Sequence, residues 1–492
     1  MAEAAKTTRI RSARWVIAWD GGAGDHRYLN DADVVFRGSE IVHVGAGFEG
    51  TVDTDIDGGH VMVMPGLVST HAHLNSAPFS TGLLEEVLDP MFGHSPMYTK
   101  KGPFWVSDVN TPGRDAGQHF VAAMRHSLTE LLGSGVTTVV DIQNTSDGDE
   151  LWCESLSESG IRAYVAPSFQ EAQWRTRDGR VLEFEWDAKA GLAGFERANA
   201  TLDTVDRFGD GRLSGMMFPA QVETVGEGLM RECREEARTR DIIWQTHCAQ
   251  SVPEFREMVA RTGRTSIQWL ADIGALDETA VLGHAIYLDH HSSLAWHSRD
   301  DLGILAESGA AIAHCPLTFS RWGTVLETFL TYRDAGVRIA MGNDTGPVNM
   351  LEEIRCAFTQ ARVASNEPAS ISMADVFRAA TIGGADALGR TDIGRIATGA
   401  KADLVLVDLA HPRMQSCTDP LRALVFVAAD RAIRDVYVDG RLVYADGNST
   451  AYDAHAASAA LNPAMQIMID EVNAASTVPD VDDITSLSFS KA

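Results

Sequence analysis

The stretch MPGLVSTHAHLN, residues 64–75, carries two histidines one residue apart at the end of an apolar run that follows a Pro-Gly pair. On an extended strand, positions i and i+2 point to the same face. We therefore expect His71 and His73 to stand side by side at the carboxyl end of a strand. Paired imidazoles in that place suggest one half of a metal site, whose other half must come from elsewhere in the chain.

Further apolar runs of strand length follow, with helix-length segments between or after them. The expected strands are residues 66–73, 136–143, 161–169, 213–221, 242–250, 280–289, 310–316 and 337–344. The expected helices include residues 115–134, 227–240, 322–335 and 349–365. Eight β/α units over about 330 residues predict an α/β fold with a closed parallel barrel of the TIM type, whose active site lies at the carboxyl ends of the strands. An open doubly wound sheet is the alternative, but no Gly-rich phosphate loop follows any of these strands.

The two ends of the chain differ from this β/α pattern. The sequence of residues 8–65 and 395–446 predicts short strands with Gly and Asp turns. Neither end is long enough to form a good sheet core alone, so we expect the two to pair into a small β-sandwich. The predicted domains are residues 1–65 with 393–448 as the sandwich, 66–392 as the barrel, and 449–492 as a helical tail. In the tail we expect a helix around residues 453–474, interrupted near Pro463, that serves as a packing or subunit-contact arm.

The composition is that of a globular protein, with 45% hydrophobic and 22% charged residues. The formal charge of −27 argues against nucleic acid or an anionic membrane surface as a partner, since both require basic patches. The apolar run WVIAW, residues 15–19, is too short to cross a membrane. The six cysteines form no CxxC pair, which predicts a reduced, cytoplasmic location. We expect a small-molecule substrate and a homo-oligomer.

Candidate metal ligands occupy the ends of several expected strands. Strand 1 ends in His71 and His73, strand 5 in His247, strand 6 in His284, and strand 8 in Asp344. Each of these residues alone has an ordinary structural explanation, but in a barrel all of them converge on one mouth. Neutral imidazoles with one carboxylate suit a divalent cation, and a catalytic site leaves one position open for water. We expect one metal ion, zinc by preference, with iron, cobalt and manganese also compatible.

These motifs resemble the amidohydrolase superfamily over about residues 10–446. The resemblance rests on PGLVSTHAH (65–73), THCAQ (246–250), VLGHA (281–285), GNDTG (342–346) and the closing TDIGRIATGAKADLVLVDL (391–409) with VYVDGRLV (436–443). It implies a distorted barrel with a β-sandwich built from both termini. It also implies that His71, His73, His247 and Asp344 bind the metal, while His284 contacts the metal, its water or the substrate carbonyl. Residues 311–350 further resemble the branch of phenylurea and molinate (thiocarbamate) hydrolases.

The number of metal ions depends on strand 4. Binuclear members of the superfamily bridge two metals with a carboxylated lysine there, or with a glutamate in some cases. The segment LSGMMFPAQVE, residues 213–223, has no lysine, and none occurs between Lys189 and Lys401. A mononuclear site is therefore expected, unless Glu223 acts as a bridge.

The expected chemistry is hydrolysis of a carbon that bears nitrogen. A divalent metal lowers the pKa of its bound water to about 7. Asp344 can take the proton from that water and pass it to the leaving nitrogen, while His284 polarises the carbonyl or stabilises the oxyanion. The main prediction is cleavage of an amide, urea or carbamate bond, including thiocarbamate.

One position departs from the deaminases of the superfamily, which usually carry a glutamate three residues after the histidine of strand 5. Gln250 stands there, and an amide cannot exchange a proton near pH 7. Glu171, His290 and His291 are candidate replacements. The alternative function is therefore a hydrolytic deaminase or dehalogenase of a nitrogen heterocycle: a purine, pyrimidine or triazine. A non-catalytic assembly protein is the third hypothesis, and the retention of every ligand argues against it.

The segments after strands 1, 3 and 7 are rich in aromatic residues, which predicts an apolar or aromatic substrate under a lid. The residues after strand 1 are Phe79, Met91, Phe92, Met97, Tyr98, Phe104 and Trp105. The candidate substrate contacts are Gln250, Trp174, Arg321 and Trp322. Packing of the long loop or of a subunit contact would explain the same aromatics, and a surface role would explain Arg321.

Overall fold

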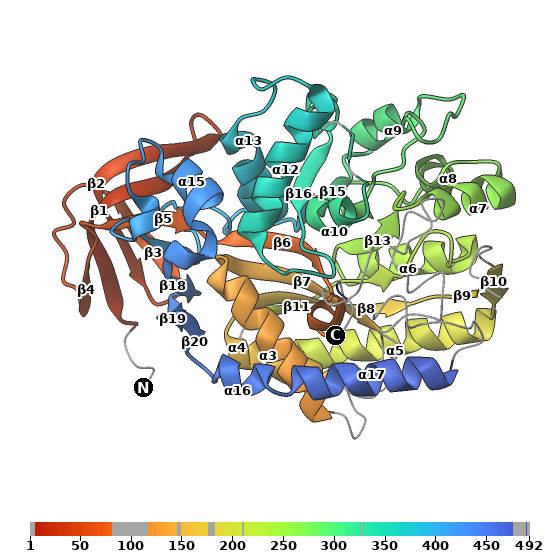
Figure 1. Ribbon diagram of the computed structural model, residues 1–492, viewed down its shortest axis with the longest axis horizontal. Coiled ribbons are helices and arrows are strands. Elements are labelled where there is room, and N and C mark those ends of the chain that lie inside the picture. The colour runs from red at the N-terminus through yellow and green to blue at the C-terminus, as the bar shows by residue number, and fades with distance from the viewer. Residues whose placement is uncertain are drawn as a thin grey trace.

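Two parallel sheets form the centre of the molecule (Figure 1). The computed structural model describes residues 5–80, 117–144, 149–175, 183–208, 211–324, 326–327, 329–475 and 489. The first sheet contains β6 (Leu67–Ala72), β7 (Val136–Asn144), β8 (Arg162–Phe169), β11 (Leu213–Gly215) and β12 (Phe218–Pro219). The second contains β13 (Trp244–Cys248), β14 (Ala280–His284), β15 (Ala311–His314) and β16 (Arg338–Met341).

Isolated parallel bridges connect these two sheets at both margins. Ala72 at the end of β6 pairs with Asp344, which follows β16. On the other side Gln221 pairs with His247, and Met217 pairs with Trp244. The carboxyl ends of β6, β13 and β16 therefore meet, although about 270 residues separate the first from the last.

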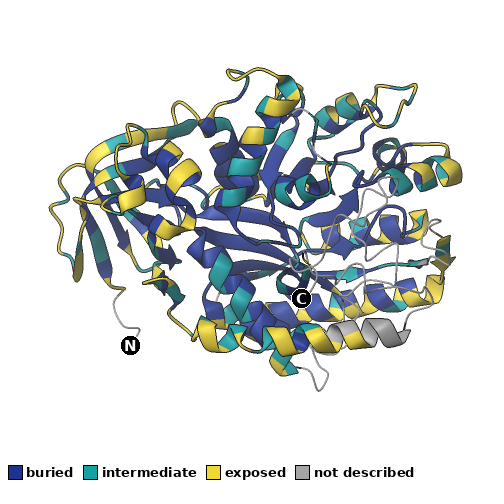
Figure 2. Ribbon diagram, in the orientation of Figure 1, coloured by how far each residue is buried: buried dark blue, intermediate teal, exposed yellow. Residues whose placement is uncertain are grey.

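Helices connect successive strands, as expected for β/α units. They are α1 (Ala77–Ser80), α3 (Gly117–Gly133), α4 (Asp149–Ser159), α5 (Ala188–Arg207), α6 (Glu227–Thr239), α7 (Val252–Thr262), α8 (Ser266–Asp272), α9 (Asp301–Ser308), α10 (Pro316–Arg321), α11 (Phe329–Asp334), α12 (Met350–Ser365), α13 (Met373–Arg378), η3 (Ala379–Gly383) and α14 (Gly384–Ala387). A separate hairpin, β9 (Ala172–Arg175) and β10 (Glu183–Trp186), follows β8. Strands β6, β13 and β14 are buried along their whole length, since parallel strands are covered on both faces (Figure 2).

The two ends of the chain share one sheet of nine strands, at the left of Figure 1. The N-terminal strands are β1 (Thr7–Asp20), β2 (Asp25–Arg37), β3 (Glu40–Gly45), β4 (Thr54–Asp57) and β5 (Val61–Pro65); the C-terminal ones are β17 (Leu404–Asp408), β18 (Ile433–Val438), β19 (Arg441–Ala445) and β20 (Asn448–Ser449). The predicted pairing of the termini is seen where β5 runs antiparallel to β17. Their apolar faces form a core of their own, with Ile10, Phe36 and Leu404 fully or almost fully buried.

A buried ion pair fastens this terminal sheet to the first parallel sheet. Arg162, at the start of β8, donates to both carboxylate oxygens of Asp403 at 3.2 Å and to Asp439 at 3.3 Å. Arg162 is 1% exposed and Asp403 is 2% exposed. Removal of Arg162 would leave the buried Asp403 carboxylate without its counter-ion.

The structure corrects two boundaries. The helix predicted over residues 322–335 is wrong: α10 ends at Arg321, and α11 covers only Phe329–Asp334. Gly323 takes a left-handed backbone conformation (φ +72°), which ends the first helix. The strand predicted over 280–289 stops at His284, because φ of +82° at His284 and +48° at Ala285 turns the chain out of the sheet.

The C-terminal arm is helical, as predicted, and packs against α3. Between β17 and β18 lie η4 (Pro412–Met414), α15 (Pro420–Ala423), η5 (Leu424–Ala428) and η6 (Ala429–Ala432); the arm itself is α16 (Ala454–Ser458) and α17 (Leu461–Ala475). The break precedes Pro463, which sits in the first turn of α17, where its missing N–H costs nothing. In the part of the chain that the structure describes, no helix combines the length and apolarity needed to traverse a bilayer.

Candidate metal centre

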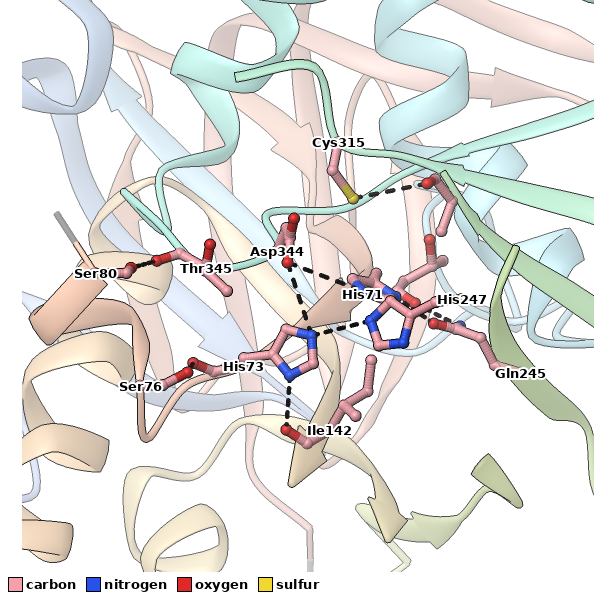
Figure 3. A network of polar contacts seen from close by, with 12 residues as sticks. His71, His73, Ser76, Ser80, Ile142, Gln245, His247, Cys315, Asp344 and Thr345 are labelled. Carbon is pink, nitrogen blue, oxygen red and sulfur yellow. Dashed lines mark hydrogen bonds and ion pairs between the residues drawn. The ribbon is translucent and has the colours of Figure 1, made fainter. Parts of the chain in front are cut away.

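Four histidines and an aspartate come together at the carboxyl ends of β6, β13, β14 and β16. Figure 3 shows His71, His73, His247 and Asp344 of this cluster. Their ligand atoms fall into two groups, each within 4.8 Å: His71 with His247 and His284, and His71 with His73 and Asp344. The Nε2 atoms of His73 and His247 are 3.3 Å apart. An Asp344 carboxylate oxygen lies 3.7 Å from His73 Nε2 and 4.0 Å from His71 Nε2. The structure thus brings every predicted metal ligand into one cluster.

Main-chain hydrogen bonds hold the ends of β6 and β16 together beneath this cluster. The N–H groups of Asn343 and Asp344 both donate to the carbonyl of His71, and the N–H of His73 donates to the carbonyl of Asp344. Asp344 takes a left-handed conformation (φ +54°) to make these contacts. Backbone in this region is sparsely populated by non-glycine residues and concentrates at functional sites.

Each of three rings is oriented by a hydrogen bond on its far side. His73 Nδ1 lies 3.2 Å from the Ile142 carbonyl, and His247 Nδ1 lies 2.6 Å from the Ala220 carbonyl. His71 Nδ1 lies 2.5 Å from Oε1 of Gln245. Because these oxygens only accept hydrogen bonds, each ring carries its proton on Nδ1 and presents the lone pair of Nε2 to the cluster.

Burial keeps these imidazoles neutral. It lowers the pKa of His73 to about 3 and that of His247 to about 4, and it lowers the pKa of His71 well below its ordinary value. Burial has the opposite effect on the carboxyl group of Asp344, whose pKa rises to about 7. A cation bound among these residues would stabilise the ionised form of the buried carboxylate and would accept the lone pairs of the neutral nitrogen donors.

A further observation also indicates that these residues fit a divalent cation. Nε2 of His71 is buried and has no hydrogen-bond partner among the residues that the structure describes. A buried nitrogen lone pair without a partner is costly unless something fills its place. Since this atom faces the other ligand atoms, a cation bound there would satisfy it.

Two glycines make room for the ring of His71. A Cβ on Gly283 would lie 3.0 Å from His71 Cε1, and a Cβ on Gly342 would lie 2.8 Å from the Cβ of His71 and from Cys315 Sγ. The glycines of the VLGHA and GNDTG motifs are therefore part of the site, because larger residues would displace the ring.

A buried carboxylate supports the turn after His73. Asp141 on β7 accepts from the N–H of Leu74 at 3.0 Å and from Trp152 Nε1 and Gln143 Nε2 at 2.7 Å. Sequence reasoning missed this residue. An aspartate inside the apolar run 136–143 was the available signal.

The four predicted substrate contacts lie in different surroundings. Trp322 packs on Phe319 (ring centroids 5.5 Å apart), which in turn packs on His284 (4.5 Å), so Trp322 is one ring removed from the cluster. Arg321 donates to the carbonyl of Gly346, in the turn after Asp344. Trp174 lies on the β9–β10 hairpin, opposite Phe184.

Gln250, the fourth of these residues, is 4% exposed in the turn after β13. Its N–H donates to the Glu254 carboxylate, which also accepts from the N–H of Ala249 and the hydroxyl of Ser266. Phe79 is buried in α1, whereas Met91, Phe92, Met97, Tyr98, Phe104 and Trp105 lie outside the described residues.

The other residues considered as proton carriers or bridges do not join the two ligand groups among the described residues. Glu171 accepts from the N–H of Gly226, before α6. His291 packs on Tyr287 and lies 3.9 Å from Glu327, and His290 packs on Tyr332. Glu223 is buried, and its pKa is raised well above the usual range by that burial and by Glu254.

Comparison with known proteins shows to which family the chain belongs. Residues 62–443 match the model of the amidohydrolase family. The chain belongs to this family. It is therefore a metal-dependent hydrolase that acts on carbon–nitrogen bonds other than peptide bonds.

Several relatives of this amidohydrolase are deaminases. A 5-methylthioadenosine/S-adenosylhomocysteine deaminase of Halobacterium salinarum is 27% identical over 431 residues, which cover 86% of this chain and 91% of that protein. An adenosine deaminase from Xanthomonas campestris with bound zinc has a similar structure (TM-score 0.76, 21% identity, 95% of this chain and 98% of the other). So has the zinc complex of atrazine chlorohydrolase from Arthrobacter aurescens (TM-score 0.76, 23% identity, 93% and 100%).

Proposed function

We propose that this amidohydrolase is a hydrolytic deaminase, or a hydrolase of a related leaving group, acting on a nitrogen heterocycle of the purine or triazine class. The observation that carries the proposal is the convergence of the His71, His73, His247, His284 and Asp344 side chains, in a chain similar to nucleoside deaminases over 86–94% of its length. This order reverses the sequence-based preference, in which cleavage of an amide, urea or carbamate came first.

We propose that His71, His73, His247 and Asp344 hold one divalent cation, with zinc as the expected metal because zinc is bound in the similar structures. Iron, cobalt and manganese suit the same donors. When bound, such a cation supplies water activated at neutral pH. Glu223 stands outside the ligand groups of the described residues, which supports a mononuclear site.

The roles of Asp344 and His284 follow from their places beside these ligands. We propose that Asp344 accepts the proton of the attacking water and returns it to the leaving nitrogen. His284, packed against His71 at 4.8 Å between ring centroids, would hydrogen-bond the substrate atom on which negative charge develops. Phe319 and Trp322 would form an apolar wall beside His284, suited to a flat ring.

Gln250 favours a second candidate function. Its amide cannot shuttle a proton to a ring nitrogen, so deamination here would need another proton donor, and Asp344 is the carboxyl group in the described ligand groups that could serve. Cleavage of an acyl C–N bond in an amide, urea or carbamate needs no ring protonation. The resemblance of residues 311–350 to phenylurea and molinate hydrolases belongs to this candidate.

We also propose how the chain is divided into domains. The bridges at both margins of the parallel sheets support a closed eight-stranded barrel over residues 66–392, with the nine-stranded sheet of 1–65 and 393–448 as a small β-sandwich and 449–492 as a tail. A cytoplasmic location, a homo-oligomeric state and the absence of nucleic-acid or membrane partners stay predictions.

The deciding experiment assays purified protein of known metal content against adenosine-type nucleosides, aminotriazines, amides, ureas and carbamates. Ammonia, halide and amine release are followed separately. We expect ammonia release from an aminoheterocycle, its loss after treatment with a chelator, and its return with added zinc. Amine release from ureas or carbamates alone would establish the second candidate, and full activity of a metal-free preparation would refute both.

A further inference from the structure

Gln245 lies beside His71 at the edge of the cluster and uses both ends of its amide there (Figure 3). It stands two residues before His247 on β13, so both side chains point to the same face of the strand. Its Oε1 lies 2.5 Å from His71 Nδ1, and its Nε2 donates to the Thr70 carbonyl at 2.8 Å. Gln245, Thr70 and His71 are all 0% exposed.

These contacts leave the amide only one orientation. The Thr70 carbonyl accepts hydrogen bonds and cannot donate, so the NH₂ group of Gln245 must face it. The carbonyl of Gln245 then faces His71, whose Nδ1 must carry the proton. With the amide reversed, two oxygens would meet at Thr70 and an NH₂ group would meet the protonated Nδ1. The hydrogen-bond network therefore assigns the Nε2 lone pair of His71 to the cluster.

His71 differs in this respect from its neighbours. The rings of His73 and His247 donate to main-chain carbonyls of Ile142 and Ala220, which no substitution removes. The partner of His71 is a side chain, contributed by a strand 174 residues further along the chain. Of these three rings, His71 is therefore the one whose tautomer depends on a side chain, and a substitution of Gln245 can change it.

We propose that Gln245 is a positioning residue of the metal centre, which fixes the tautomer and the ring angle of His71 for cation binding. This inference rests on the proposed metal ligation. It goes beyond that proposal because Gln245 itself contributes no metal ligand. Partners that orient ligands in this way typically change metal affinity by about 10–100-fold when they are replaced.

The test compares Gln245→Met with Gln245→Glu in the full-length protein. Methionine has a similar length but offers no oxygen to His71. Glutamate offers that oxygen, and in its protonated form it also donates to Thr70, which reproduces the amide pattern. Gln268→Met is the control, because Gln268 is a partly buried glutamine whose amide donates to Ser298 and Asp301 and to no proposed ligand.

The measurement is the zinc dissociation constant of each metal-free protein, obtained by competition with a chromogenic chelator. We expect Gln245→Met to bind zinc about 10–100-fold more weakly, and Gln245→Glu and Gln268→Met to stay much closer to the wild type. Thermal unfolding of the metal-free forms accompanies each titration, since a role limited to packing would lower stability and leave the zinc affinity unchanged. Equal affinity of wild type and Gln245→Met would overturn the inference.

A second measurement needs no variant to fold. In metal-free wild-type protein labelled with ¹⁵N-histidine, the NMR signals of His71 should show a proton on Nδ1, and a proton on Nε2 would contradict the proposal. A wild type that binds no metal would instead refute the proposed function, so the two failures are distinguishable.

Discussion

At the scale of single residues, the site depends on imidazoles that stay neutral because they are buried. Burial deprives the charged forms of His71, His73 and His247 of hydrating water, which favours their neutral forms. Each ring also has an oxygen partner for Nδ1. Neutral, oriented nitrogen donors are what a divalent cation requires, since a protonated imidazole has no lone pair to offer. Asp344 provides the charge.

Replacement of a ligand should abolish turnover without unfolding the chain. We expect His71→Ala and Asp344→Asn each to weaken zinc binding by at least about 100-fold, beyond the effect of a supporting residue, and to reduce activity to background. His43→Ala, which changes a half-buried histidine of the terminal sheet, serves as the control. Zinc content and circular dichroism of the purified variants provide the readout, and full activity in either ligand variant refutes the assignment.

At the scale of elements, the turns that follow the strands position the site, and the turn after β13 shows how. Ser251 caps α7, and Glu254 in its first turn reaches back to the N–H groups of Ala249 and Gln250. Ala249 has a positive φ of 51°, and its carbonyl accepts from the N–H groups of Ile286 and Tyr287 after β14. One carboxylate therefore stabilises a strained turn that connects two ligand-bearing strands.

Glu254→Ala should accordingly destabilise the protein. Its loss leaves two buried N–H groups and the Ser266 hydroxyl without their acceptor, at a cost of about 1–3 kcal/mol for each group left unsatisfied. Glu257→Ala, on the same helix but without these contacts, is the control. Urea denaturation gives the free energy of unfolding, and equal values for the two variants would show that Glu254 has no such role.

At the scale of the whole molecule, the terminal sheet is joined to the rest of the chain by buried and partly buried polar contacts. Arg162 with Asp403 is one such contact, and His26 is another. His26 on β2 hydrogen-bonds Thr381 in η3 at 3.0 Å and packs against Trp19 and Phe377. Burial lowers the pKa of His26 from 6.5 to about 4.

This depressed pKa predicts a pH dependence of stability. Between pH 6.5 and 4 the unfolded chain binds a proton at His26 that the folded chain does not, so the free energy of unfolding falls as the pH falls. His26→Gln keeps a donor for Thr381 but cannot titrate, and should lose less stability over this interval. Urea denaturation at several pH values compares it with wild type and with His60→Gln, at an exposed position; an unchanged pH slope in His26→Gln would contradict the prediction.

The sequence could predict the strands and the clustering of the candidate ligands because both leave local signals. Apolar runs located β6, β7, β8, β13, β15 and β16 within a few residues, and histidines at strand ends marked the cluster. The predictions failed where a backbone conformation was decisive: at Gly323, which ends α10, and at His284, which ends β14. No sequence pattern predicts a positive φ at a histidine.

By itself, then, the sequence determined the parallel α/β fold and which residues would gather in the candidate metal centre, because hydrophobic periodicity and strand ends are properties of neighbouring residues. Only the tertiary structure decided which oxygen orients each ring. The partners of His71, His73 and His247 come from other segments of the chain, 27 to 174 residues away, so their contacts exist only after the chain has folded. Hydrogen bonds have a reach of about 3 Å, and no spacing along the sequence encodes such a distance.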